Sequence, residues 1–72
     1  MTPNEQRVLT ELRTAWYDSA NLTYLAARPV EIGTALEPGM GVTGSDWASR
    51  HLRRLVKRGL VECVSKGLYR AV

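Results

Sequence analysis

The chain has 72 residues, of which 44% are hydrophobic and 24% charged, and its formal net charge is +3. This length predicts a single domain, residues 1–72, whose thin core leaves little room for a substrate pocket, so a binding module is favoured over an enzyme. The single cysteine, Cys63, allows neither an internal disulfide nor a zinc site of the CxxC type, and no stretch approaches the roughly 20 apolar residues of a membrane span. We therefore expect a cytoplasmic protein without a catalytic site, metal, cofactor, small-molecule substrate or membrane partner.

The first third of the chain predicts a helix. Thr2 and Glu5 have the spacing of a capping box, and Pro3 suits the first helical position. Apolar residues then recur at spacings of three and four, which is typical of one buried helical face: Val8, Leu9, Leu12, Ala15 and Trp16. We expect this helix to span about residues 3–17.

The middle third predicts shorter elements. Residues 18–21 are polar and turn-prone, and the following residues 22–25 have β propensity, so they form either a brief strand or a last helical turn. Pro29 can open a second helix over about residues 29–36, with an apolar side formed by Val30, Ile32, Ala35 and Leu36. The glycine-rich residues 39–44 predict a loop.

The last third predicts a helix and a hairpin. Ser45 is a good N-cap, Asp46 suits the positive end of the helix dipole, and Gly59 is placed just past the C-terminus, so we expect a helix over residues 45–58. The β-prone runs 60–64 and 68–72 are separated by three residues that include Gly67, which predicts a tight antiparallel hairpin over residues 60–72.

Charge is distributed unevenly along the chain. Residues 1–44 carry three basic and five acidic side chains, a net charge of −2, whereas residues 45–72 carry seven basic and two acidic ones, a net charge of +5. On a helical wheel, Ala48, Leu52, Leu55 and Val56 share one side of the helix at 45–58. The opposite side carries Asp46, Arg50, Arg53, Arg54 and Lys57. A face held only for solubility normally mixes both signs, so this stripe favours double-stranded DNA as the partner.

Residues 45–72 resemble the recognition helix and wing of winged helix-turn-helix regulators from bacteria, archaea and phages. The resemblance rests on Ser49-Arg50-His51-Leu52, on Leu55, on residues 57–62 and on Tyr69, while residues 29–36 are similar to the preceding helix of the family. It implies a small α+β winged helix-turn-helix fold, with three helices and a C-terminal β-hairpin wing. One departure is the connection over residues 37–44, which is longer than the three or four residues usual in the family.

The resemblance also implies a set of DNA-contacting residues. The positions that reach bases or phosphates from the recognition helix are matched by Ser45, Trp47, Ser49, Arg50, Arg53 and Arg54, and the wing tip by Lys66. By their chemistry, Arg50 and Arg53 suit base edges, and the side chains suited to phosphates are Ser45, Ser49, Lys57 and Lys66. Trp47 lies on the helix flank, where a core or rim role is commoner than a DNA contact.

Several alternatives carry less weight. Residues 39–44 match GxGxxG, but neither a preceding strand nor a βαβ unit accompanies them, which argues against dinucleotide binding. His51, the only histidine, is expected to be packed and hydrogen-bonded. A winged-helix protein–protein interaction module is the main alternative function, and RNA binding is a third. Exposed parts of Trp16, Tyr17 and Tyr24 could form a homodimer contact that reads two half-sites.

Overall fold

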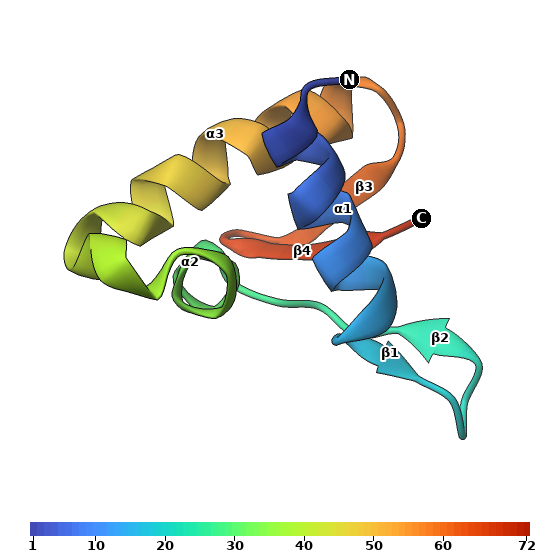
Figure 1. Ribbon diagram of the computed structural model, residues 1–72. Coiled ribbons are helices and arrows are strands. Elements are labelled where there is room, and N and C mark those ends of the chain that lie inside the picture. The colour runs from blue at the N-terminus through green and yellow to red at the C-terminus, as the bar shows by residue number, and fades with distance from the viewer.

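Three helices and a C-terminal β-hairpin dominate the computed structural model, which describes residues 1–72 (Figure 1). The helices are α1 (Pro3–Thr14), α2 (Pro29–Leu36) and α3 (Gly44–Lys57), with a 3-10 helix, η1 (Pro38–Thr43), between the last two. The strands form two antiparallel pairs, β1 (Tyr17–Asp18) with β2 (Thr23–Tyr24), and β3 (Val61–Ser65) with β4 (Leu68–Ala71). The predicted α+β class is confirmed, and three helices followed by a C-terminal hairpin are consistent with a winged-helix layout.

α1 begins as predicted and ends early. The Thr2 hydroxyl accepts a hydrogen bond from the Glu5 N–H at 3.2 Å, and the Glu5 carboxylate accepts one from the Thr2 N–H at 3.4 Å, which completes the capping box. The helix ends at Thr14, so the predicted continuation to residue 17 is wrong. The reason is tertiary: Tyr17 pairs in extended conformation with Tyr24, and their ring centroids lie 4.9 Å apart.

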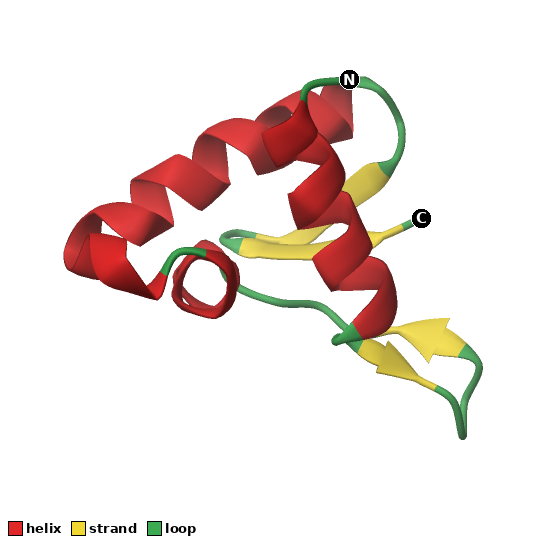
Figure 2. Cartoon of the chain, in the orientation of Figure 1, coloured by secondary structure: helices red, strands yellow, loops and turns green.

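The β1–β2 hairpin confirms the short strand predicted within residues 22–25. Its turn is held by the Asp18 carboxylate, which accepts hydrogen bonds from the N–H groups of Ala20 and Asn21 at 3.0 and 3.4 Å. Figure 2 shows this hairpin projecting away from the helices, beyond the C-terminal end of α1. Leu22 at its turn is 78% exposed, so the hairpin adds little to the core.

The segment between α2 and α3 is not the predicted loop. α2 has the predicted bounds, but residues 38–43 form η1, with a turn permitted by the positive φ of 58° at Gly41. η1 leads directly into α3, whose N-cap is Thr43 in a right-handed helical conformation without a side-chain capping bond. The prediction that Ser45 caps α3 is therefore wrong, because the 3-10 turn leads into the helix earlier and moves the N-cap two residues back, to Thr43.

α2 and α3 touch through their backbones at two glycines. A Cβ atom added to Gly33 would lie within 3.0 Å of three backbone atoms of Gly44, a distance that real Cβ atoms do not adopt. Both glycines are buried. The pair therefore sets how closely the two helices cross, even though their connection is longer than in the family that the sequence resembles.

α3 ends and the hairpin begins with a Schellman motif. Gly59 has a φ of 76°, its N–H donates to the Val56 carbonyl at 3.0 Å, and the Leu60 N–H donates to the Leu55 carbonyl at 3.1 Å. β3 then runs back from the end of α3, so that in Figure 1 the hairpin turn points toward α2. The predicted hairpin is confirmed, with a bulge between Cys63 and Ser65.

A third segment extends this sheet. Ala27, just before α2, forms an isolated antiparallel bridge with Tyr69 in β4, through hydrogen bonds of 2.7 and 2.9 Å. The order across the sheet is thus Ala27, β4, β3. This bridge holds the start of α2 beside the wing.

The core lies between α3 and the other helices. Leu52 and Leu55 on α3 are fully buried, as predicted, and pack in one cluster with Val8, Leu12 and Ile32 from α1 and α2. The remaining members of the cluster are Leu9, Ala27, Trp47, Ala48, Val61 and Ala71. Partly buried side chains close its edges: Trp16, Tyr24, Leu36, Val56, Leu60 and Tyr69.

Candidate nucleic-acid interface

The outer side of α3 carries a continuous stripe of charged side chains. Asp46, Arg50, Arg53, Arg54 and Lys57 are all exposed, as the helical wheel predicted, whereas Ala48, Leu52 and Leu55 on the other side are buried. The apolar side is bound to the core, so the orientation of the stripe is fixed by packing. The 14 residues of α3 span about 21 Å, which is long enough for several turns of contact along a groove.

The cations of this stripe have no partner within the protein. Four of the ten basic side chains form ion pairs, and these are Arg7, Arg28, Arg58 and Arg70. None of the four lies on the outer stripe. Five of the six remaining cations are Arg50, Arg53, Arg54, Lys57 and Lys66, and none of these forms a side-chain hydrogen bond or ion pair. A polyanion can therefore bind them without breaking an internal pair.

Trp47 does not belong to this surface. It is 7% exposed and lies in the core cluster, with its ring 5.0 Å from the His51 ring and 5.6 Å from the Arg7 guanidinium. Its position on the wheel faces α1 instead of solvent. We therefore remove Trp47 from the expected DNA-contacting residues. Burial of its large apolar ring stabilises the core of so small a domain.

Ser45 and Ser49 lie on the flank between the stripe and the core. Both are half-buried, and neither hydroxyl forms a hydrogen bond within the protein. A serine hydroxyl in such a position is free to donate to an external acceptor such as a phosphate oxygen.

Lys66 lies in the turn between β3 and β4 and is exposed. The neighbouring Gly67 has a φ of 75°, a left-handed conformation that permits the tight turn in which Lys66 lies. Farther from the turn, Arg70 is paired with Glu62 across the two strands, so it contributes little free charge. Lys66 is therefore the unpaired cation of the wing.

A buried carboxylate joins the far end of α3 to α1. The Glu5 side chain is 3% exposed, and its Oε2 lies 3.4 Å from Nε of Arg58. Burial raises the pKa of Glu5, but the hydrogen bonds from Thr2 and the charges of Arg58 and Arg54 outweigh it, so the pKa lies below its ordinary value of 4.5. Sequence reasoning assigned Glu5 to the capping box alone, because its second partner is distant along the chain.

Arg7 makes a similar link that the sequence did not reveal. Its guanidinium donates to the Glu37 carboxylate and to the Leu36 carbonyl, both at 3.0 Å, and lies over the Trp47 ring. α1 thereby contacts the end of α2 and the first turns of α3. This cation is used for holding the helices together and is not available to a ligand.

His51 is packed as expected, but its Nδ1 is buried without a hydrogen-bond partner. Burial lowers the pKa of His51, Arg54 and Arg50 lower it further, and Glu5 alone raises it, so the pKa lies below the ordinary value of 6.5. The imidazole is therefore neutral at neutral pH and adds no charge to the stripe.

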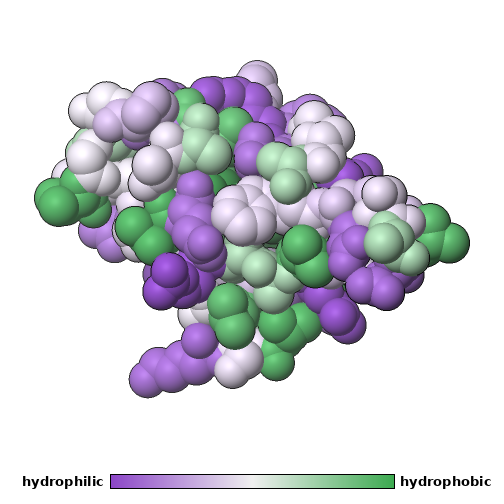
Figure 3. All heavy atoms as spheres, turned by 90° about the horizontal axis from the view of Figure 1, so that it is seen from below, coloured by the Kyte–Doolittle hydropathy of each residue, from purple (hydrophilic) through white to green (hydrophobic).

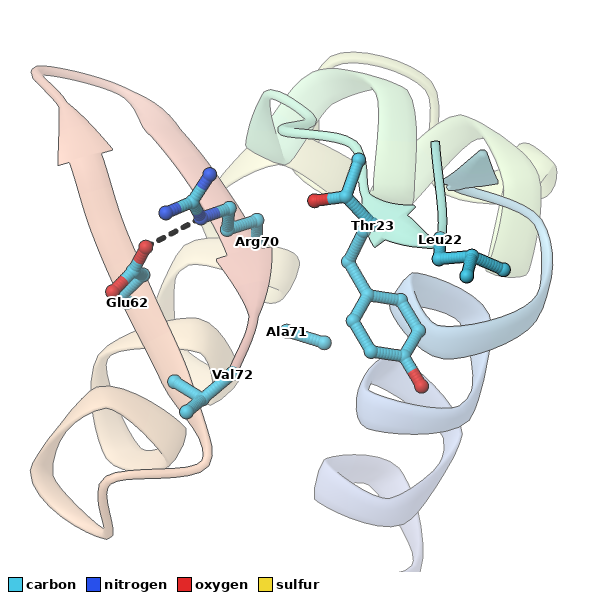
Figure 4. Close-up of a pocket in the computed structure, with 7 residues that line it drawn as sticks. Leu22, Thr23, Glu62, Arg70, Ala71 and Val72 are labelled. Atoms are coloured by element: carbon cyan, nitrogen blue, oxygen red, sulfur yellow. Dashed lines mark hydrogen bonds and ion pairs between the residues drawn. The ribbon is translucent and has the colours of Figure 1, made fainter. Parts of the chain in front are cut away.

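The two hollows of the surface are small. One, of about 290 Å³, lies between the β1–β2 hairpin and β4 and is lined by Leu22, Thr23, Tyr24, Glu62, Arg70, Ala71 and Val72 (Figure 4). Figure 4 shows Glu62 and Arg70 joined to each other across its edge. The other has the same volume and lies against α1, near Arg7 and Leu36. Both have volumes at the lower limit of small-molecule sites.

Comparison with protein-family models, with curated proteins and with solved structures finds no match for this chain. The helices of the structure also lack the length and apolar character required to cross a membrane.

Proposed function

We propose that this domain binds double-stranded DNA, with α3 in the major groove and the β3–β4 hairpin as a wing along the backbone. The observation that carries the proposal is the set of five exposed cations without internal partners on α3 and at the hairpin turn. The major groove admits an α-helix, and guanidinium groups pair with guanine edges and with phosphates. The other outward cations of the domain are mostly neutralised by internal carboxylates.

The proposed contacts divide by chemistry. Arg50 and Arg53, at the middle of the exposed stripe, are assigned to base edges. Phosphate contacts are assigned to Ser45, Ser49, Arg54, Lys57 and Lys66. Together they place base readout at the centre of the surface and backbone contacts around it.

The winged-helix layout supports a place among winged helix-turn-helix regulators, with a role in transcription or in phage or plasmid maintenance. A cytoplasmic location suits this role and the free thiol of Cys63. Two copies would be needed to read two half-sites, and the half-exposed Tyr17 of the β1–β2 hairpin is a candidate for their contact.

A mobility-shift titration of a mixed-sequence duplex at several salt concentrations tests the proposal. If the five free cations each neutralise one phosphate, the plot of log affinity against log salt should have a slope of about −4 to −5. The variant Arg13→Ala is the matched control: Arg13 is an exposed cation without an ion-pair partner on α1, outside the stripe and the hairpin, so the slope should not change. Absence of binding at low salt would refute DNA binding and favour the protein-interaction module.

A further inference from the structure

The most exposed large apolar side chain of the protein lies directly beside the cationic stripe. Val42 in η1 is 94% exposed and stands two residues before α3 begins. On the face that it draws, Figure 3 shows separate apolar groups set among hydrophilic side chains. A valine so fully in contact with water contributes nothing to the core, and its burial against a partner would be favourable.

The backbone leads from Val42 directly into the first turn of α3. Thr43 (φ −80°, ψ −13°) and Gly44 (φ −60°, ψ −33°) are both in the right-handed helical region, so the chain continues from Val42 into α3 without a break, after the non-helical Gly41 (φ 58°, ψ −127°). Val42 itself belongs to a 3-10 helix, in which about one turn separates it from Asp46 in the first turn of α3. Val42 therefore lies at the N-terminal end of the helix that carries Arg50 and Arg53.

Two contacts anchor the residues that follow Val42. Gly44 lies against the backbone of Gly33, and the Thr43 hydroxyl donates to the Met40 carbonyl at 2.9 Å. A side chain presented from such a segment loses little conformational freedom when it is bound, and valine has few rotamers to lose. The position thus suits a specific contact.

We propose that Val42 reads thymine, by contact with the C5 methyl group in the major groove. This inference rests on the proposed DNA binding through α3. Thymine is the base that presents an apolar group in that groove, and apolar side chains contact it there. A protein partner would require a cluster of apolar anchors, whereas η1 exposes only Val42 and, to 37%, Met40, ahead of a stripe of charged side chains.

The geometry also predicts where the thymine lies. Eight residues separate Val42 from Arg50, which corresponds to about 12 Å along the helix axis, or about three to four base pairs. The thymine should therefore lie about that far from the guanine assigned to Arg50, toward the end of the site that η1 approaches.

The probe for this test is the tightest-binding duplex selected from a random library, synthesised with thymine replaced by uracil at one position at a time. Uracil lacks only the methyl group. Loss of one buried methyl contact should weaken binding by the wild-type protein about fourfold at one position. Val42→Ala should remove the difference between the thymine and uracil duplexes, whereas Leu22→Ala, a matched exposed side chain on the β1–β2 turn, should retain it.

Each outcome bears on the proposal. If wild type does not distinguish thymine from uracil at any position, or if Val42→Ala distinguishes them as well as wild type does, thymine readout by Val42 is refuted while DNA binding stands. If no duplex binds, the proposed function fails and this inference with it. Both substitutions lie outside the core, so thermal melts of the two variants should match wild type.

Discussion

Substitution of Gly33 by alanine should destabilise the protein, although alanine is the better helix former. The added Cβ would lie within 3.0 Å of three backbone atoms of Gly44, so α2 and α3 must separate. Overpacking of this kind costs about 1–3 kcal/mol, and the higher helix propensity of alanine offsets about 1 kcal/mol. We expect the free energy of unfolding to fall by about 1–2 kcal/mol in total. In a domain of this size, the Tm should fall by about 4–8 °C for each kcal/mol.

Gly44→Ala provides the matched control. Its Cβ would meet Gly33 at 3.5 Å, an ordinary contact, and Gly44 already has helical dihedral angles. This substitution should be neutral or stabilising by up to about 1 kcal/mol. Urea denaturation and thermal melts of both variants measure the difference. If Gly33→Ala were as stable as Gly44→Ala, the close crossing of α2 and α3 would be refuted.

Three further predictions concern α3 and the Glu5 side chain of α1 that is packed against its end. Leu52→Ala should lower the free energy of unfolding by about 2–5 kcal/mol because the side chain is fully buried, whereas the exposed Arg53→Ala variant should melt like wild type. If Arg53→Ala melted early and Leu52→Ala melted like wild type, α3 would be packed on its opposite face. In binding assays, Arg53→Ala should weaken a preferred site by about 1–3 kcal/mol and relax base preference, whereas Lys66→Ala should weaken all duplexes alike and reduce the salt slope by about 1. Equal losses on preferred and random DNA for both variants would exclude base reading by Arg53. The pKa values of His51 and Glu5 are lower in the folded protein than their ordinary values of 6.5 and 4.5. Each group's contribution to the free energy of unfolding is therefore complete above pH 6.5 for His51 and above pH 4.5 for Glu5, and it is lost as the pH falls through the lower folded-state pKa. On acidification, the free energy of unfolding should decrease in two steps. His51→Gln should remove the upper step and Glu5→Gln the lower one; an unchanged pH profile in both variants would contradict this assignment.

Local sequence signals were sufficient to predict most elements of this fold. The capping box of Thr2 and Glu5, the proline at the start of α2 and Gly59 at the end of α3 are short-range features, and each lies where it was expected. The helical periodicity around Leu52 predicted which side of α3 is buried, because the period of an α-helix is the same in any tertiary context.

Tertiary contacts decided the remaining features. α1 ends at Thr14 because Tyr17 pairs with a strand that follows it, and no local signal outweighs that pairing. Trp47 is buried because α1 covers that flank of α3, which a helical wheel of one element does not contain. The close approach of Gly33 to Gly44 depends on two helices meeting in space.

The candidate site shows the same division. The exposed arginines of α3 could be predicted from periodicity and charge, but which cations are free depends on carboxylates distant in the sequence. Glu5 forms an ion pair with Arg58, and Glu37 forms one with Arg7, and in both pairs the partners are too far apart in the sequence for a local pattern to predict them. The cations of the outer stripe are the ones that remain unpaired. Ion pairing acts over a few ångströms in space, so only the folded arrangement of the chain selects the charges that remain available to a partner.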